Sequence, residues 1–403
     1  MSESVQLETI AATAGVGSDP AFRSVAPPLH LSANYAWNDP LDKPQYDYAR
    51  SGNPTRSQLE EALCALEGAA KGVVVSSGMA AVDLVLNLVN PGELVIAPHD
   101  CYGGTHRLLT ARGKRGQFEI EYVNQTDIEA LRTAFARKPK LVLIETPSNP
   151  LLRITDIAAV VELAKECDAI TVADNTFLSP ALQRPLDLGC DIVIHSTTKF
   201  LNGHSDVVGG AALAKDQKLG EDLAWWANCT GVTGAPFDSF MTLRGIRTLF
   251  PRIERQQKTA EDVVNALNED KRVVAVNYPG LKAHPGHEIA KRQQKGFGSM
   301  FSVEFDENVD VIEFLRKLQT FTIAESLGGF ESLVCLPAEM THAAMTPEAR
   351  ETAGISNRLV RFSIGLEHTD DLVRDIFSAL EQAVAAGNEK VAFLPNKAAS
   401  KCA

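Results

Sequence analysis

The stretch Ile192-Val-Ile-His195-Ser196-Thr-Thr198-Lys199-Phe200 decides the interpretation of the fold, because an apolar strand runs directly into hydroxyl residues and a lysine. At the carboxyl end of a strand in an open α/β sheet, side chains project into the crevice where ligands bind. A lysine that is desolvated there can lose its proton, and the neutral amine can then form a Schiff base with a carbonyl compound. Ser196 and Thr198 are suitably placed to donate to a phosphate. On this stretch alone, a strand followed by a surface lysine is an equal alternative.

The chain around this stretch alternates short apolar strands with helices. Strands are expected at 73–75, 94–97, 118–123, 141–144, 170–173 and 209–214. Capping boxes at Ser57-Gln-Leu-Glu60 and Thr126-Asp-Ile-Glu129 predict where two of the helices begin, and the first of them should stop at Gly68. This alternation is typical of an α/β fold with a mostly parallel sheet covered by helices on both faces.

The pattern changes in the second half of the chain. It is helical from about Pro236, and residues 278–298 form a connection rich in Gly, Pro, His and Lys. Strands at 300–305 and 360–364 and a last amphipathic helix from Thr369 predict a smaller C-terminal α+β domain. We therefore divide the chain into an N-terminal extended segment (1–56), a large domain (57–250) and a C-terminal domain (251–403).

The N-terminal segment has little helical or strand periodicity, as a disordered tail would. It nevertheless contains Tyr35, Trp37, Tyr46 and Tyr48, which is too much aromatic surface for a solvated tail. We expect this segment to pack against another surface, such as a neighbouring subunit.

Composition excludes several classes of protein. With 403 residues the chain is long enough for two cores, and a net charge of −12 argues against a surface for nucleic acid or anionic membrane. No apolar run approaches the length of a membrane span. Seven scattered cysteines without CxxC spacing favour reduced thiols in a cytoplasmic protein. The pair His284 and His287 lacks accompanying ligands, so we expect no metal site.

Three further positions at strand ends carry candidate chemistry. Ser77-Gly78-Met79 lies where a strand becomes a helix, so the free N–H groups of the helix start could hold a phosphate. Asp174 closes a strand, and a carboxylate there can keep a pyridinium nitrogen protonated. Tyr102 could stack on a flat ring. Taken singly, these residues are as readily explained as a plain turn, a helix cap and a core residue. The motifs GxGxxG and GxxxxGK[ST] are absent.

A last candidate lies in the C-terminal domain, in the strand Val360-Arg361-Phe362-Ser363-Ile364-Gly365. Alternation places Arg361 and Ser363 on one face and the apolar residues on the other. The polar face could be open to solvent, or it could form one wall of a site where the guanidinium binds a carboxylate through two hydrogen bonds.

Taken together, these motifs resemble the cystathionine γ-synthase family, the Cys/Met-metabolism group of pyridoxal-phosphate enzymes, over nearly the whole chain. The motifs that carry the resemblance are Tyr48-Ala-Arg50-Ser-Gly-Asn-Pro-Thr-Arg56, Ser77-Gly-Met79, Tyr102-Gly-Gly104, Pro147-Ser-Asn-Pro150, Asp174-Asn-Thr-Phe177, Ser196-Thr-Thr-Lys199, Glu325-Ser-Leu-Gly-Gly329 and Arg361. The resemblance implies a fold-type I pyridoxal-phosphate enzyme of bacterial type that acts on small amino acids as a cytoplasmic homotetramer, with sites shared between subunits.

The resemblance also implies a role for each matching residue. Lys199 would hold pyridoxal phosphate covalently and move protons, Asp174 would pair with the ring nitrogen, and Tyr102 would stack on the ring. The phosphate would be held by two groups of residues, those of one subunit and those of its neighbour: Gly78, Met79, Ser196 and Thr198, with Tyr48 and Arg50 of the neighbour.

Substrate roles follow in the same way. Arg361 would bind the substrate α-carboxylate with help from Asn149, and the outer part of the pocket would contain Asp47, Arg107, Glu325 and Ser326. Arg107 would meet a succinyl carboxylate.

The reaction implied is γ-replacement, in which O-succinyl-L-homoserine and L-cysteine give L-cystathionine and succinate, a transsulfuration step of methionine biosynthesis. Gly104 stands where methionine γ-lyases have cysteine, which disfavours that activity. Ser51 stands where the synthases carry a second arginine. Cystathionine γ-lyase activity and an O-acetylhomoserine-using synthase or sulfhydrylase therefore stay open, as does a cofactor-binding protein without turnover.

Overall fold

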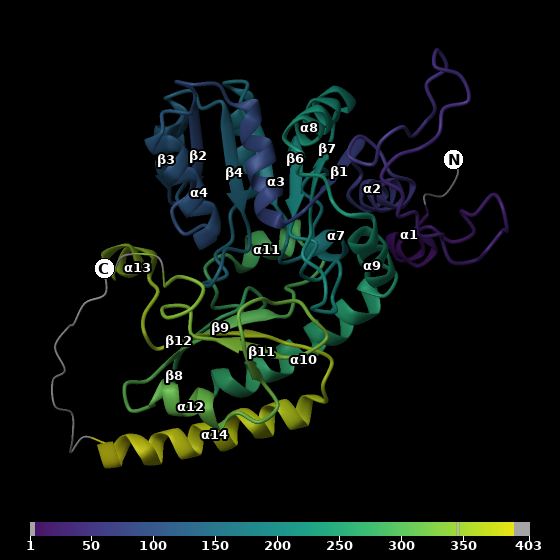
Figure 1. Cartoon of the computed structure of the whole chain (residues 1–403). Coiled ribbons are helices and arrows are strands. Elements are labelled where there is room, and N and C mark those ends of the chain that lie inside the picture. Colours follow the sequence, from purple (N-terminus) through teal and green to yellow (C-terminus); the bar gives the residue numbers. More distant parts are fainter. Residues whose placement is uncertain (1–4, 344, 346, 391–403) are drawn as a thin grey trace, which may run out of the picture.

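The computed structural model describes residues 5–343, 345 and 347–390, which form two sheets with their helices (Figure 1). The larger sheet has the strand order β1-β7-β6-β5-β4-β2-β3. Its strands are β1 (Lys71–Val75), β2 (Leu94–Pro98), β3 (Glu119–Val123), β4 (Leu141–Glu145), β5 (Ile170–Asp174), β6 (Ile192–His195) and β7 (Gly210–Ala214). Strands β2 to β6 run parallel to one another, whereas β7 runs antiparallel to both β1 and β6. The predicted mostly parallel α/β sheet is confirmed.

Helices cover both faces of this sheet, which is why strands β2 and β4 are buried at every residue. The helices of this part are α2 (Pro54–Glu67), α3 (Gly78–Val85), a 3₁₀ turn (Leu86–Leu88), α4 (Gly103–Lys114), α5 (Ile128–Phe135), α6 (Ile157–Lys165), α7 (Ser179–Leu182), α8 (Gln217–Thr230) and α9 (Pro236–Ile246). One core packs α3 and α8 against the sheet, and another packs α5 and α6 against the opposite face.

The smaller sheet has the order β10-β11-β12-β9-β8 and lies below the larger one in Figure 1. Its strands are β8 (Val273–Asn277), β9 (Met300–Phe305), β10 (Thr322–Ile323), β11 (Leu333–Cys335) and β12 (Leu359–Ser363). The helices of this part are α10 (Leu249–Asn268), α11 (His287–Gln293), α12 (Val311–Lys317), α13 (Pro347–Ala353) and α14 (Thr369–Lys390). The predicted α+β character of the C-terminal part is therefore present.

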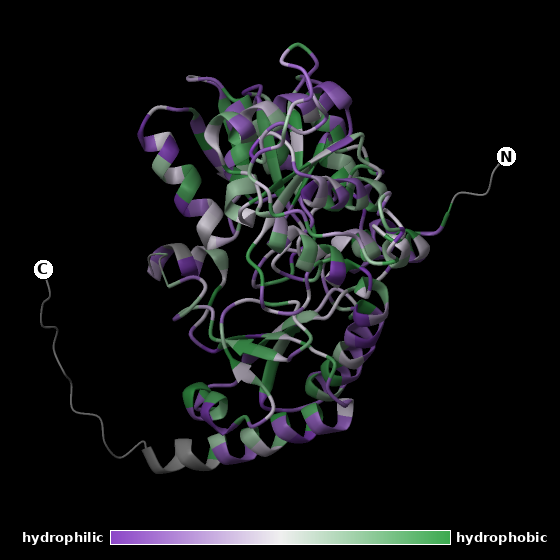
Figure 2. Cartoon of the chain, turned by 45° about the vertical axis from the view of Figure 1, so that its right-hand side comes forward, coloured by the Kyte–Doolittle hydropathy of each residue, from purple (hydrophilic) through white to green (hydrophobic). Residues whose placement is uncertain are grey.

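The final helix shows why this part folds as a unit. Along α14, Leu372, Ile376 and Leu380 are fully buried against the second sheet, together with Val263 of α10. In Figure 2 this helix alternates purple and green, as an amphipathic helix lying across a core does. The C-terminal half of α10 belongs to this core, whereas Leu249 and Ile253 at its start pack in a core of the large domain. We therefore propose that the boundary expected at residue 250 lies within the first half of α10.

Several local predictions were wrong. Helix α2 begins at Pro54, not Ser57, because the Asn53 side chain accepts hydrogen bonds from the N–H groups of Thr55 and Arg56 and proline suits the first helical position. Similarly, Asp127 rather than Thr126 caps α5. The predicted stop at Gly68 is confirmed by its left-handed backbone, with φ of 77°.

The helices that the sequence did not predict include two in stretches that were expected to be irregular. The connection 278–298 contains α11, and the N-terminal segment contains the short helix α1 (Leu7–Thr13). Helix α1 has only seven residues, too few for a period to be recognised, and it inserts Ala11 into a core beside Leu59 and Leu243. Between α1 and α2 the segment has turns and isolated β-bridges but no strand, and Phe22, Leu41 and other apolar side chains are exposed.

Candidate active site

A cavity of about 430 Å³ lies where the carboxyl ends of β4, β5 and β6 meet the second sheet. It brings together eleven of the residues predicted from the sequence, namely Gly78, Met79, Tyr102, Asn149, Asp174, Ser196, Thr198, Lys199, Glu325, Ser326 and, from β12, Arg361. A larger cleft, of about 610 Å³, lies elsewhere between the two sheets and contains none of these side chains. The candidate active site is therefore the cavity at the strand ends, as expected for an open α/β sheet.

One end of the cavity is a glycine cradle at the start of α3. The Ser77 side chain caps this helix by accepting from the N–H of Ala80 at 3.0 Å. A Cβ atom on Gly78 would lie 2.7 Å from the Cβ of Ser196, so only glycine lets the helix start approach the strand exit this closely. The hydroxyl of Thr198 is engaged by the backbone of Gly209. Free N–H groups at a helix start beside a serine hydroxyl are suited to a phosphate.

The Lys199 amine lies deeper in the cavity. Its Nζ donates to the Oγ of Ser326 at 2.6 Å. Burial lowers the pKa of Lys199 to about 8, assisted by the charge of Arg361 and opposed by that of Glu325. A sizeable fraction of the amine is therefore neutral at slightly alkaline pH, as a nucleophile or proton acceptor must be. Ser326 has a left-handed backbone, with φ of 84°, which is a costly conformation for serine and aims its hydroxyl at the lysine.

Asp174 closes β5, the strand beside β6, and lines the same cavity. Its Oδ1 accepts from the backbone N–H of Thr176 at 3.0 Å, and burial raises the pKa of this carboxyl. Among the described residues, no lysine or arginine forms an ion pair with Asp174. A buried carboxylate without a cationic partner is disfavoured, and the N–H of a bound pyridinium ring would supply that partner.

Arg361 faces the cavity, which decides between the two interpretations of its strand. Its side chain is only 3% exposed, its Nη1 donates to Asn149 Oδ1 at 2.9 Å, and its Nη2 donates to the carbonyl of Ser326 at 2.8 Å. The large domain and the second sheet therefore meet at this guanidinium. A buried arginine held in plane by two acceptors is suited to binding a carboxylate.

Tyr102 begins α4 and borders the same cavity with a ring that is 41% exposed. A Cβ atom on Gly104 would lie 2.6 Å from Cε1 of Tyr102 and 2.9 Å from Sδ of Met79. A side chain at position 104 would therefore have to displace the Tyr102 ring and the Met79 sulfur from the places that they have in this structure.

Four predicted residues do not line the cavity of their own chain. Tyr48 is 51% exposed, and the exposed Arg50 donates to the carbonyl of Asn228. The carboxylate of Asp47 accepts from Ser51 at 2.8 Å and pairs with a lysine. Arg107 is exposed on α4, and its guanidinium group has no hydrogen bond or ion pair within the described part of the chain.

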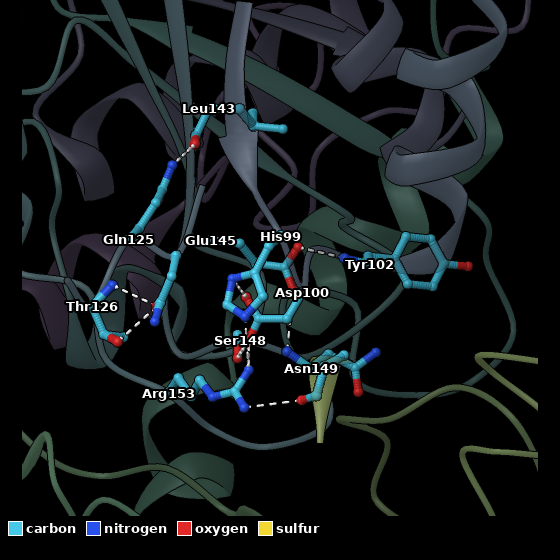
Figure 3. Close-up of polar contacts among 12 residues, drawn as sticks. His99, Asp100, Tyr102, Gln125, Thr126, Leu143, Glu145, Ser148, Asn149 and Arg153 are labelled. Atoms are coloured by element: carbon cyan, nitrogen blue, oxygen red, sulfur yellow. Dashed lines mark hydrogen bonds and ion pairs between the residues drawn. The ribbon is translucent and has the colours of Figure 1, made fainter. Parts of the chain in front are cut away.

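Sequence reasoning missed Glu145, which closes β4 and lines the cavity. Its carboxylate accepts hydrogen bonds from the backbone N–H groups of Tyr102 at 2.8 Å and Asn149 at 3.2 Å (Figure 3). Burial raises the pKa of this carboxyl well above its ordinary range, and the adjacent Asp174 adds to the effect. Its signal was present, because Glu145 is a carboxylate at a strand end just as Asp174 is.

Other site classes find no support in the described residues. Within residues 5–343, 345 and 347–390, no group of three or more His, Cys, Asp and Glu side chains could hold a metal ion. No helix in the described part of the chain is long and apolar enough to cross a bilayer. The six described cysteines are free thiols, and Cys402 lies outside the described residues.

The residues present fit pyridoxal phosphate. The glycine cradle at α3 suits its phosphate, the buried Asp174 lacks the counter-charge that its ring nitrogen provides, and the Lys199 amine has a lowered pKa. The three features lie in one cavity, so they can act on one molecule.

Comparison with known proteins agrees with this fit. The family model for Cys/Met metabolism PLP-dependent enzymes matches residues 8–381. Cystathionine γ-synthase of Escherichia coli (strain K12) is 52% identical over 91% of this chain and 96% of its own. Cystathionine β-lyase of Lactococcus lactis (strain MG1363) is 42% identical over 91% of this chain and 97% of its own.

The fold comparison gives the same result. The crystal structure of cystathionine γ-synthase from Xanthomonas oryzae pv. oryzae in complex with cystathionine is 53% identical, has a TM-score of 0.94, and covers 95% of this chain and 99% of its own. Both synthases and lyases are therefore among the relatives, all of one fold and one cofactor. The chain belongs to the Cys/Met-metabolism family of PLP-dependent enzymes, and its cofactor is pyridoxal 5′-phosphate.

Proposed function

We propose that the protein catalyses γ-replacement, forming L-cystathionine and succinate from O-succinyl-L-homoserine and L-cysteine, and thus serves as the transferase of transsulfuration in methionine biosynthesis. The observation that carries the catalytic part is that Lys199, Asp174 and Arg361 line one cavity, with the pKa of Lys199 lowered to about 8. The preference for a synthase rests on similarity, since two synthases are 52% and 53% identical to this chain and the β-lyase is 42% identical.

The side chains of the cavity would have different roles in the reaction. When bound, pyridoxal phosphate supplies an electron sink for carbanion chemistry at the substrate. Arg361, held by Asn149 and by the Ser326 carbonyl, binds the α-carboxylate and thereby orients the Cα–H bond toward Lys199. After leaving Ser326, the neutral Lys199 amine would accept the proton from Cα, and it would have to give up that proton before it could accept one from Cβ.

Two charged residues of the outer pocket would select the substrates. The exposed carboxylate of Glu325 lies close enough to influence Lys199, and it would attract the ammonium group of cysteine or cystathionine. Arg107 has no hydrogen-bonded or ion-paired partner within the described residues and would meet the succinyl carboxylate. Asp47 would lie at the same outer end.

We also propose that each site is shared between subunits of a homotetramer built as a dimer of dimers. Tyr48 and Arg50 are exposed and outside the cavity of their own chain, and the aromatic N-terminal segment leaves apolar side chains uncovered. In such an assembly Tyr48 and Arg50 would contact the phosphate of the neighbouring subunit's cofactor. The unpaired thiols support a cytoplasmic setting.

A substrate panel tests this function. With cysteine present, O-succinylhomoserine should release succinate and form cystathionine in equal amounts, faster than O-acetylhomoserine releases acetate. Faster oxoacid release from cystathionine would instead identify a cystathionine lyase, the second candidate, which Ser51 favours because it replaces an arginine of the synthases. Faster use of the acetyl ester would identify an O-acetylhomoserine enzyme, and no turnover with any substrate would identify a cofactor-binding protein.

A further inference from the structure

Glu145 lines the cavity that holds both the candidate cofactor residues and the candidate substrate residues. It is the last residue of β4 and is paired in register with Asp174, the last residue of β5. Its side chain is 8% exposed, so its two oxygens must find partners within the protein.

Those partners are backbone groups of the two loops that carry site residues. The Oε2 atom accepts from the N–H of Tyr102 at 2.8 Å, and the Oε1 atom accepts from the N–H of Asn149 at 3.2 Å (Figure 3). Tyr102 holds its ring at the cavity, and Asn149 holds Arg361 through a 2.9 Å hydrogen bond. One carboxyl group therefore fixes the backbone of a residue that faces the cofactor and of a residue that orients the carboxylate-binding arginine.

We infer that Glu145 is a positioning residue that couples the ring-stacking loop to the carboxylate-binding loop, so that cofactor retention and substrate binding depend on the same side chain. This inference rests on the proposed function for its substrate half and on the family's cofactor for the other half. Without the Glu145 oxygens, the backbone N–H groups of Tyr102 and Asn149 lose their acceptor. Because an unpaired buried N–H group costs free energy, the two loops would shift to find other partners.

The electrostatics of the strand ends favour this arrangement. Burial and the neighbouring Asp174 disfavour a charge on Glu145, whereas the two N–H donors favour it, and the net effect raises the pKa of the carboxyl well above its ordinary range. The two backbone N–H groups therefore offset part of the cost of burying this carboxyl group. Glutamine at this position would keep the volume, but its one carbonyl oxygen can replace only one of the two oxygens of Glu145, and its NH2 group would face the other backbone N–H.

The control is another buried carboxylate with the same type of bonds. Asp375 of α14 is 9% exposed and accepts from the backbone N–H groups of Gln319 and Thr320 at 2.8–3.1 Å, within the second core and outside the cavity. Asp375→Asn therefore measures the cost of disturbing a buried carboxylate without moving the site.

The experiment compares holoenzymes of wild type, Glu145→Ala, Glu145→Gln and Asp375→Asn. Cofactor release into a trapping agent, KM for the homoserine ester and the melting temperature are measured for each. Glu145→Ala should raise both the release rate and KM roughly tenfold, the scale expected when a buried donor loses its acceptor. Glu145→Gln should raise both less than alanine does, and Asp375→Asn should lower only the melting temperature.

The inference is overturned if Glu145→Ala matches Asp375→Asn, with a lower melting temperature and unchanged release and KM. If the alanine variant does not fold, the glutamine variant decides by the same comparison. Cofactor release is independent of the substrate identity. A protein that failed to use homoserine esters would therefore disprove the proposed function and still leave the role of Glu145 open to this test.

Discussion

Replacing Lys199 by methionine should change how the stability of the cofactor-free protein depends on pH. Methionine has a similar length and no charge, so it removes the cost of burying an ammonium group. The pKa of Lys199 is lowered from 10.5 to about 8, chiefly by burial. At about 1.4 kcal/mol for each pKa unit between folded and unfolded states, this difference corresponds to about 3 kcal/mol. Methionine also loses the hydrogen bond from Lys199 Nζ to Ser326, which reduces the expected gain in the free energy of unfolding by about 1 kcal/mol.

The direction of this pH dependence follows from the number of protons that the folded and the unfolded states bind. Below pH 8 the lysine is protonated in both states, and the full cost of burying its charge is present. Between pH 8 and 10.5 the unfolded chain holds the proton and the folded protein does not, so stability rises with pH. Lys199→Met should therefore be more stable than wild type by about 2 kcal/mol at pH 7 and lose that advantage by pH 10.5.

Urea unfolding of both cofactor-free proteins at pH 7, 8, 9 and 10 measures this difference, because other titrating groups cancel in the comparison. A wild-type curve that runs parallel to the Lys199→Met curve across this range would refute the assignment of a desolvated amine.

Three further changes test the cavity. Arg50→Ala should weaken cofactor binding about ten- to a hundredfold by removal of a charge-assisted hydrogen bond, and mixing it with Lys199→Ala subunits should restore some activity; no rescue after verified subunit exchange would speak against shared sites. Arg107→Ala should reduce kcat/KM for O-succinylhomoserine far more than for O-acetylhomoserine, whereas equal losses would remove Arg107 from the pocket. Gly78→Ala would place a Cβ atom 2.7 Å from that of Ser196, so the cofactor Kd should rise at least roughly tenfold, and an unchanged Kd in a spectroscopic titration would contradict the phosphate cradle.

Much of the fold could be predicted because its signals are local. The strand before Lys199 is continuously apolar, and each neighbouring strand of the larger sheet is similarly short and buried, as a parallel sheet between helices requires. Helix starts were predicted less well, since Asn53 and Ser57 are both good caps, and the signal that favours Asn53 is Pro54, which suits the first helical position. Helix α1 was invisible because its burial depends on Ala11, a residue that carries little hydrophobic signal.

A site residue could be predicted where its type and its place at a strand end reveal its role. It could not be predicted where that role depends on contacts with residues distant in the sequence. Lys199 and Asp174 stand out as polar residues at strand ends, and the structure places both in one cavity. The burial of Arg361 depends on Asn149, which is 212 positions away in the sequence, so its strand alone could not distinguish a solvent face from a pocket wall. Glu145 acquires its partners only when β4 lies beside β5 and the loop to Tyr102 folds over both.

The most direct test of the account is to reduce the holoenzyme with borohydride and locate the cofactor by peptide mass mapping. The lowered pKa and the burial of Lys199 at the end of β6 predict that a single peptide carries the cofactor, attached at Lys199. Retention of the cofactor on any other lysine, or its complete loss after reduction, would contradict the central claim that this strand end is the catalytic site.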